Sequence, residues 1–418
     1  MMRMQCVLIG IVGTSLAAAA DWPQFRGPDG QGHTDVADLP LTWSATDNVR
    51  WKADLPGVGW SSPVVVDGAI YLTTAVPQGS EVKPDQSLRV LCLDAATGTP
   101  RWNVEVLKEI GADAPNIHKK NSHASPSVLV EAGRVYAHFG HMGTACLDAE
   151  NGAILWKNND HPYTPVHGNG SSPVLWGDLL IFSADGGDVP AVIALKKETG
   201  ELAWKVTRES DAKRKFSFCT PLIVEVEGQP QLITPGSGVV QGLNPADGTE
   251  IWRVQYDQGY SVVPRPVVAD GRLYVCTGYD HPRLLAIRLA EAKGDVTATH
   301  VDWTLAKQVP HNPSVVVVDG LLFMLADKGA LSCVDAATGE VYYAQRCVGP
   351  SSASILSAPG RLYLLDERGQ CKVMAPEKIY RELADNLIDE RTLASLAVVE
   401  SDLLLRTESH LYRLSSQR

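Results

Sequence analysis

Short runs of β-branched and aromatic residues, each bounded by a polar turn, recur along most of the chain. The fullest copy runs from Ser61 to Trp102 and reads SSPVVVDG, then AIYL, then VLCLDAATG before the tryptophan. Apolar runs of this length, separated by Asp-Gly or Thr-Gly turns, are typical of strands joined by hairpins. Each copy therefore predicts four antiparallel strands.

The turn after the third strand is the most regular part of the repeat. An Asp-like residue is followed four positions later by glycine and four further on by an aromatic residue, and we interpret each such triplet as a docking turn. The acidic side chain can hydrogen-bond the turn backbone, and glycine permits a positive φ. We expect each tryptophan to be largely buried against the neighbouring repeat. The copies are Asp94/Gly98/Trp102, Asp148/Gly152/Trp156, Lys196/Gly200/Trp204, Asn244/Gly248/Trp252 and Asp335/Gly339/Tyr343.

The number of repeats follows from the starts of the first strands. They fall at Pro63, Pro126, Pro173, Pro221, Pro266 and Pro313, with weaker starts near Ser352 and Leu393. The last repeat shows three strands, and the segment 48–54 (NVRWKAD) has the pattern of an outer strand without a repeat of its own. Sheet-only repeats of about 50 residues favour radial blades. The sequence therefore predicts an all-β, eight-bladed propeller over residues 48–418, closed by an N-terminal strand that joins the last blade.

The N-terminus has the pattern of a secretory signal. Arg3 precedes an apolar run that ends at Ala17 and is followed by Ala18, Ala19 and Ala20 before Asp21, so residues 1–20 are predicted to be a signal peptide cleaved after Ala20. The run is too short to span a membrane. Residues 21–47 begin DWPQFRGPDGQG and predict an irregular strap across the propeller surface. We expect a soluble monomer in the periplasm or outside the cell, with association with the envelope left open.

Charge and cysteine content narrow the partners. The formal net charge is −11, and the basic cluster Lys213–Lys215 is short, so nucleic acid and anionic membrane surfaces are not expected partners. Cys92, Cys146, Cys333 and Cys371 occupy the same strand position in different repeats, too far apart for disulfides. Buried core cysteines are the expectation, with a redox role as the alternative.

No catalytic or metal-binding pattern stands out. A GxSxG elbow, a Walker loop and a GxGxxG fingerprint are all absent from the sequence. The close histidine pairs, His118 with His123 and His138 with His141, have no CxxC or HExxH partner, so no metal site is predicted.

One position stands out in an alignment of the residues that precede the first-strand prolines. Ser62, Ser125, Ser172 and Thr220 are small hydroxyls, but Arg265 and Asn312 follow. A buried arginine needs either a carboxylate of the protein or a bound anion, and both alternatives stay open. Innermost strands approach the central channel, so we predict a ligand site at one channel mouth. Its residues are His123, His167, Asn169, Arg265, His311 and Asn312.

The phrases SSPVVVDGAIYL, LCLDAATGTPRW and CVDAATGEVYY resemble PQQ-like, quinoprotein-type propeller repeats. The resemblance covers nearly the whole mature chain and implies a position between PQQ-dependent dehydrogenases and BamB-like scaffolds. Such dehydrogenases hold Ca²⁺ beside PQQ, often under a disulfide between adjacent cysteines. This sequence has neither adjacent cysteines nor a Ca²⁺-loop pattern. We expect a non-catalytic binding or scaffold propeller for a small anionic ligand or a protein partner; the alternatives are a PQQ-dependent enzyme and a structural part of an envelope assembly.

Overall fold

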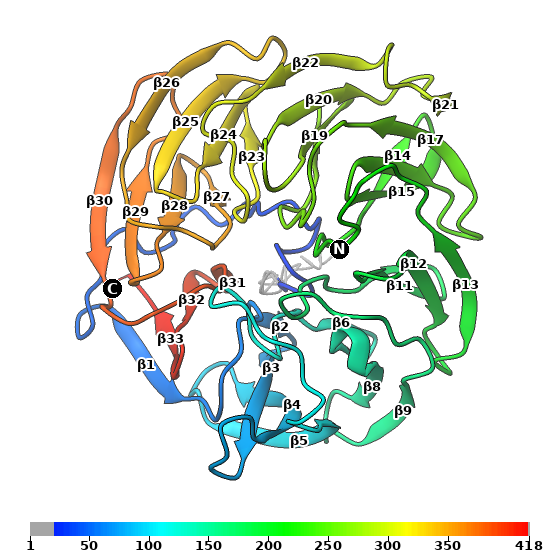
Figure 1. Cartoon of the computed structure of the whole chain (residues 1–418). Coiled ribbons are helices and arrows are strands. Elements are labelled where there is room, and N and C mark those ends of the chain that lie inside the picture. Colours follow the sequence, from blue (N-terminus) through cyan, green and yellow to red (C-terminus); the bar gives the residue numbers. More distant parts are fainter. Residues whose placement is uncertain (1–20, 417–418) are drawn as a thin grey trace, which may run out of the picture.

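Eight antiparallel sheets surround a central axis in the computed structural model, which describes residues 21–416 (Figure 1). Blades one and two contain β2 (Val64–Val66), β3 (Ala69–Gln78), β4 (Asp85–Asp94), β5 (Pro100–Glu109), and β6 (Leu129–Glu131), β7 (Arg134–His138), β8 (Thr144–Asp148), β9 (Ile154–Asn158), with the short helix η1 (Gly140–Met142). Blades three and four contain β10 (Val174–Trp176), β11 (Leu179–Asp185), β12 (Pro190–Lys196), β13 (Leu202–Thr207), and β14 (Leu222–Val226), β15 (Gln229–Gly236), β16 (Val239–Leu243), β17 (Glu250–Gln255).

The second half of the ring repeats this order from inner to outer strand. Blades five and six contain β18 (Val267–Ala269), β19 (Arg272–Cys276), β20 (Leu284–Arg288), β22 (Val301–Leu305), and β23 (Val316–Val318), β24 (Leu321–Leu325), β25 (Ala330–Asp335), β26 (Val341–Arg346). Blades seven and eight contain β27 (Leu356–Ala358), β28 (Arg361–Leu365), β29 (Gln370–Met374), β30 (Glu382–Leu387), and β31 (Ala397–Val399), β32 (Asp402–Arg406), β33 (His410–Leu414), β1 (Val49–Asp54). The extra segment of blade five adds β21 (Gly294–Asp295) to blade four, parallel to β17.

The ring closes as the sequence predicts. β1 is the outer strand of blade eight and pairs with β33 in antiparallel register, Ala53 opposite Leu411. At the ends of this pair, Leu55 N–H donates to Ser409 O at 2.8 Å and Ser415 N–H to Asn48 O at 2.8 Å. Because the first and last strands share one sheet, blade eight has four strands like the other blades, and the outer edge of β33 is paired.

Neighbouring blades are joined by tryptophans of the outer strands. The indole N–H of Trp102 donates to Ala149 O in blade two at 3.1 Å, and that of Trp156 donates to Lys197 O in blade three at 2.9 Å. The ring of each tryptophan lies against the turn glycine of the next blade, Gly152 or Gly200, where a Cβ would come within 3 Å of it. Trp51, Trp204 and Trp303 repeat the arrangement.

The docking turns at Gly248 and Gly339 show the same packing between neighbouring blades that the sequence predicts. A Cβ on Gly248 would lie 2.8 Å from the Trp204 ring, and one on Gly339 would lie 2.8 Å from the Trp303 ring. In both turns the ring comes from the preceding blade. The positive φ expected at these glycines is confirmed, +75° at Gly248 and +77° at Gly339.

Burial of the tryptophans is less uniform than predicted. Trp156 is 9% exposed and Trp252 is fully buried, but Trp102 and Trp204, which also lie on outer strands, are only half-buried. Trp252 also departs from the pattern, since its indole N–H donates to Gln231 Oε1 of its own blade at 2.8 Å. Blade five has no Asp…Gly turn whose glycine could pack against the Trp252 ring.

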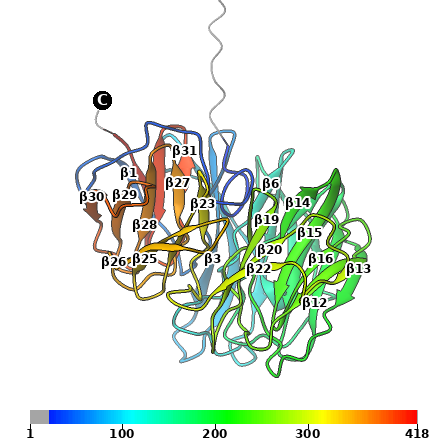
Figure 2. The ribbon, with the colours of Figure 1, turned by 90° about the horizontal axis from the view of Figure 1, so that it is seen from above.

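The strap, residues 21–47, covers one face of the ring (Figure 2). Trp22 forms a β-bridge with Val65, and both backbone hydrogen bonds are shorter than 3 Å. Leu39 and Trp43 are buried in a cluster shared with blades seven, eight and one. The predicted signal peptide lies outside the described residues. Across residues 21–416, no helix is long and apolar enough to cross a membrane. The seven cysteines of this part are buried and unpaired.

Candidate binding site

A ring of hydroxyl groups surrounds the channel, two residues before each inner strand. Seven backbone N–H groups of this ring donate to the hydroxyl oxygen of the equivalent residue in the next blade, at 2.8 to 3.1 Å. The acceptors are Ser62, Ser127, Ser172, Thr220, Ser314, Ser354 and Ser395. Since each oxygen accepts a backbone N–H, its own hydrogen remains for another acceptor.

Two positions of the predicted alignment are wrong. In blades two and six the ring residues are Ser127 and Ser314, not Ser125 and Asn312. The proline lies two residues earlier relative to the strand in these blades, so that the ring residue follows it. Counting back from the apolar run, as in Ser127-Val128-Leu129, would have found the register.

Arg265 takes the eighth ring position, lies on the strap side and forms no ion pair with a carboxylate of the described residues. It is 2% exposed. Its guanidinium donates to Pro221 O at 3.0 Å, to Gln24 Oε1 at 3.4 Å and to Phe25 O. Burial lowers the pKa of Arg265 to about 10. The alternative of an internal ion pair is therefore wrong: neutral oxygens, two of them from the strap, are the partners.

Arg265→Met should lower the free energy of unfolding by about 3 kcal/mol, because buried carbonyl oxygens lose charged donors. Urea unfolding measures the loss of stability. Arg101→Met, which removes a surface ion pair with Asp94, is the control and should cost less than about 1 kcal/mol. A small loss for Arg265→Met, combined with stabilisation of the parent protein by added anions, would instead indicate an anion site.

The strap closes the end of the channel at which Arg265 contacts Gln24 and Phe25. Phe25 lines the central cavity from the strap side. The neighbouring Arg26 is 2% exposed and donates to Val315 O at 2.8 Å, while its Nε and Nη1 are buried without a partner in the described structure. Burial, with a contribution from Arg265, lowers the pKa of Arg26 to about 9. The strap is thus anchored to blade six by Arg26, which donates to Val315 O, and to blade five by Arg265, which donates to Phe25 O.

The other end of the channel is an open funnel with a cavity volume of about 310 Å³. Nine serines and six aromatic residues line it, together with four basic side chains, and none of the described lining residues is Asp or Glu. The aromatic residues are Phe25, Trp60, Phe216, Phe218, Tyr260 and Tyr279; the basic ones are His118, Lys120, His167 and Arg214.

Four of these aromatic residues form a continuous arc with two histidines on one side of the funnel: Phe216, Phe218, Tyr260 and Tyr279, with His167 and His311. Phe216 lies at its centre, with ring centroids 5.6 Å from His167 and 5.5 Å from Tyr260. Tyr260 contacts Tyr279, which stacks on His311 at 4.4 Å. These residues come from loops that precede blades three to six or lie within blade five. The arc presents flat apolar surface to the cavity.

A loop of residues 110–122, here called the bridging loop, crosses the mouth. Lys120 Nζ lies 2.8 Å from Glu367 Oε1 of blade seven, and Lys119 O accepts from Arg391 at 2.5 Å. On the other side, the backbone N–H of His118 and the side-chain amide of Asn121 donate to His167 O. The loop therefore narrows the entrance and ties blades two, three, seven and eight together above the funnel.

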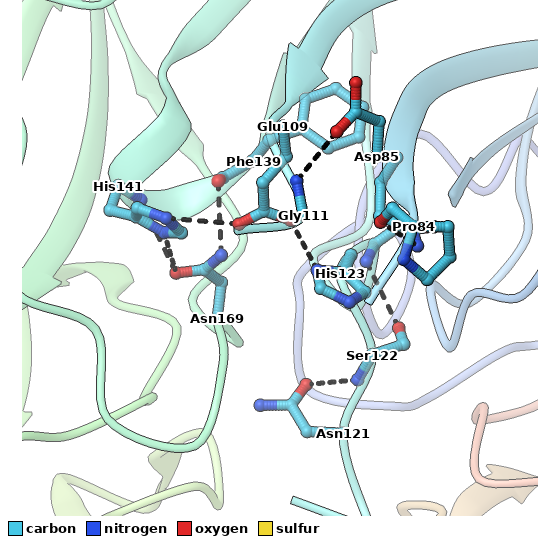
Figure 3. Close-up of polar contacts among 12 residues, drawn as sticks. Pro84, Asp85, Glu109, Gly111, Asn121, Ser122, His123, Phe139, His141 and Asn169 are labelled. Carbon is cyan, nitrogen blue, oxygen red and sulfur yellow. Dashed lines mark hydrogen bonds and ion pairs between the residues drawn. The ribbon is translucent and has the colours of Figure 1, made fainter. Parts of the chain in front are cut away.

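His123, predicted for the mouth, belongs to a separate cluster around Glu109 (Figure 3). The Glu109 carboxylate is 4% exposed; it contacts His123 Nδ1 through one oxygen and His141 Nε2 at 3.3 Å through the other. Asn169 is buried on the far side of His141 and donates to Phe139 O at 3.2 Å. Burial raises the pKa of Glu109, but the hydrogen bonds from the two histidines outweigh it and bring it to about 2.

Glu109 should therefore stabilise the protein in a pH-dependent way. Its folded pKa lies below the unfolded value of about 4.3, so its contribution is present above pH 4.3 and is lost as the pH falls toward 2. Glu109→Gln is expected to cost about 2 kcal/mol at pH 6 and distinctly less at pH 3, measured by urea unfolding. Glu198→Gln, on the surface, is the control. An equal loss at both pH values would contradict the assignment.

The remaining predicted residues divide between the funnel and its rim. His167 and Asn312 line the cavity. His311 N–H donates to Asp327 Oδ2, and the Asn312 amide donates to Asp327 Oδ1. Burial raises the pKa of Asp327, but these donors lower it below the ordinary value. The structure thus brings His167, His311 and Asn312 to one mouth and leaves His123, Asn169 and Arg265 elsewhere.

The sequence analysis missed most of the funnel. Phe216, Phe218, Tyr260 and Arg214 lie in loops between blades, whose patterns differ from one repeat to the next. The available indication was the cluster Lys213–Lys215 next to Phe216 and Phe218, an aromatic and basic segment directly before an inner strand.

Comparison with known proteins places the fold in a family. A family model described as outer membrane protein assembly factor BamB matches residues 42–231, 89–304 and 286–378, which together cover most of the chain. The chain belongs to this family. BamB of Yersinia pestis is 27% identical over 238 residues, which are 53% of this chain and 56% of that protein. A polyvinylalcohol dehydrogenase of a Pseudomonas species is 25% identical over 259 residues, 53% of this chain and 40% of the enzyme. The chain thus spans about half the length of these relatives.

Solved structures show the same fold. BamB of Moraxella catarrhalis superposes with a TM-score of 0.60 and 12% identity, covering 88% of this chain and 99% of that one. The quinohemoprotein alcohol dehydrogenase of Comamonas testosteroni gives a TM-score of 0.69 and 12% identity, covering 96% and 81%. At this identity the likeness concerns architecture, which scaffolds and enzymes share.

The funnel residues do not fit Ca²⁺-bound PQQ, the group that the dehydrogenase branch of the fold implies. Ca²⁺ prefers several oxygen ligands, carboxylates among them. No described lining residue is a carboxylate, and the nearby Asp327 and Glu367 already bind His311, Asn312, Lys120 and Ser352. Within residues 21–416, no three His, Cys, Asp or Glu side chains are grouped to hold a metal ion.

Proposed function

We propose that the protein is an exported, non-catalytic binding propeller that holds a small ligand in the funnel. The observation that carries this proposal is the composition of the funnel: an aromatic arc and hydroxyl groups above a plugged floor, with no described carboxylate in the lining. Concave, largely apolar sites with a few polar groups are typical of ligand pockets. The lining does hold two histidines, His118 and His167, but neither forms an ion pair with a carboxylate among the described residues, and no set of metal ligands is grouped within residues 21–416.

Membership of this family supports a binding role but does not identify the ligand. One relative is named as an assembly factor and another as a dehydrogenase of a polyhydroxylated polymer. Export follows from the predicted signal peptide and agrees with the outer-membrane role in the first relative's name. A docked protein partner at the funnel is the other candidate, since the bridging loop and Lys213–Lys215 extend the site outward.

Thermal melts against a panel of sugars, organic acids and PQQ with Ca²⁺ test the proposal. At least one sugar or organic acid is expected to raise the melting temperature in a concentration-dependent way. Tyr260→Ala should abolish this shift, whereas Tyr342→Ala, on the outer strand of blade six, should preserve it. PQQ-dependent oxidation of an alcohol, or binding that is insensitive to Tyr260→Ala, would overturn the proposal.

A further inference from the structure

The funnel rim carries positive charge on an acidic protein. The formal net charge is −11, yet Lys213, Arg214 and Lys215 are exposed beside the mouth. Within residues 21–416 none of the three forms an ion pair; Arg214 instead lies 4.6 Å over the Tyr260 ring. A local field of this sign raises the local concentration of anions. Burial, with a contribution from His167, lowers the pKa of His118, so that His118 adds little positive charge at neutral pH.

The deeper funnel favours hydroxyl groups over phosphate. Phosphate sites use converging backbone N–H groups or guanidinium forks. Here the backbone N–H groups of the ring donate to serine and threonine hydroxyls, and the Arg265 guanidinium donates to Pro221 O and to Phe25 O of the strap. A serine hydroxyl both donates and accepts, which matches the hydroxyls of a sugar. The aromatic arc adds flat surface for the C–H face of a sugar ring.

The funnel has one entrance. Phe25 and the strap block the channel below, and the bridging loop spans the mouth above. A sugar chain would therefore enter by its end, because a continuous chain has no exit. Its first rings would meet the aromatic arc and the serines, and the carboxylates of the following rings would meet Arg214 and its neighbours.

We propose that the funnel binds the terminal residues of an acidic oligosaccharide, a sugar chain whose rings carry carboxylate groups. This inference rests on the proposed function and specifies its ligand class. It assigns recognition of the charge to Arg214 and recognition of the ring to Phe216 and Tyr260.

Isothermal titration of the full mature chain with a galacturonate trimer tests the inference. The trimer is expected to bind with one site per protein. The same trimer with its carboxylates reduced to alcohols should bind at least tenfold more weakly, and Arg214→Gln should weaken binding of the acidic trimer by a similar factor. Lys293→Gln, another exposed cation, is the matched control and should leave the affinity unchanged.

Recognition of the end of the sugar chain can be tested separately. The amount of protein bound by a long galacturonate polymer should depend on the number of chain ends and not on the length of the chain. Several bound proteins per chain would contradict a funnel that is closed at its lower end. Equal affinity for the reduced trimer would overturn the acidic class. If neither trimer binds but isophthalate does, in a way that depends on Tyr260, the ligand is an aromatic acid: the inference fails and the proposed function stands.

Discussion

Deleting residues 21–55 is expected to abolish the cooperative unfolding transition of the protein. The deletion removes β1, the outer strand of blade eight, and with it the backbone pairing to β33 along Val49–Asp54. It also removes the Trp51 indole, which donates to Ala95 O of blade one at 3.0 Å and packs on Gly98. Blade eight would then expose a strand edge and lose its contact with blade one. Differential scanning calorimetry should show a broad transition or none.

Two further variants separate ring closure from loss of the strap. Deleting residues 21–47 keeps β1 and should lower the melting temperature while preserving a single transition. Appending residues 48–54 after Ser416 through a short turn, in the 21–55 deletion, should restore cooperativity, because β33 already ends beside the start of β1. A sharp transition in the 21–55 deletion without this rescue would show that the ring tolerates an open blade.

The predictable parts of this fold are those that each blade encodes locally. Alternating apolar runs and Asp…Gly turns specify strands and hairpins, so the blade number and the closing strand 48–54 follow from counting. The turn glycines are also visible in the five copies that carry a docking turn, and packing of the aromatic ring on a neighbouring blade was predicted, but not which of the two neighbouring blades supplies the ring. At Gly248 and Gly339 it comes from the preceding blade. Burial of each tryptophan depends on contacts that the repeat pattern does not encode, such as the hydrogen bond from Trp252 to Gln231 within one blade.

The site was less predictable because it depends on contacts between distant residues. Arg265 stands out in the alignment, but its partners Gln24 and Phe25 are about 240 residues away along the chain. His123 and Glu109 lie close in sequence, yet the predicted loop gave no reason to pair them. The loops between blades do not follow the repeat, so no pattern in the sequence marks Phe216 or Tyr260. Binding residues are often found in such loops.

Trp156→Ala should lower the free energy of unfolding by about 3–5 kcal/mol, measured by urea denaturation. The ring is 9% exposed, packs on Gly200 and donates to Lys197 O at 2.9 Å, so truncation leaves both a cavity and an unpaired carbonyl between blades two and three. The opposite change tests the same contact from the other side. A Cβ on Gly200 would lie 2.5 Å from the Trp156 ring, so Gly200→Ala should also destabilise the protein, by crowding.

Gly271→Ala separates crowding from backbone strain. Gly271 has φ +72°, against +76° at Gly200, but a Cβ there meets no atom within 4 Å. Its substitution should therefore cost only the left-handed backbone penalty, about 1–2 kcal/mol. Gly200→Ala should cost about 1–3 kcal/mol more in the parent protein and no more than Gly271→Ala in the Trp156→Ala background, because the clash disappears with the ring. Additive losses in this cycle would mean that the tryptophan and the glycine do not form the contact that joins the blades.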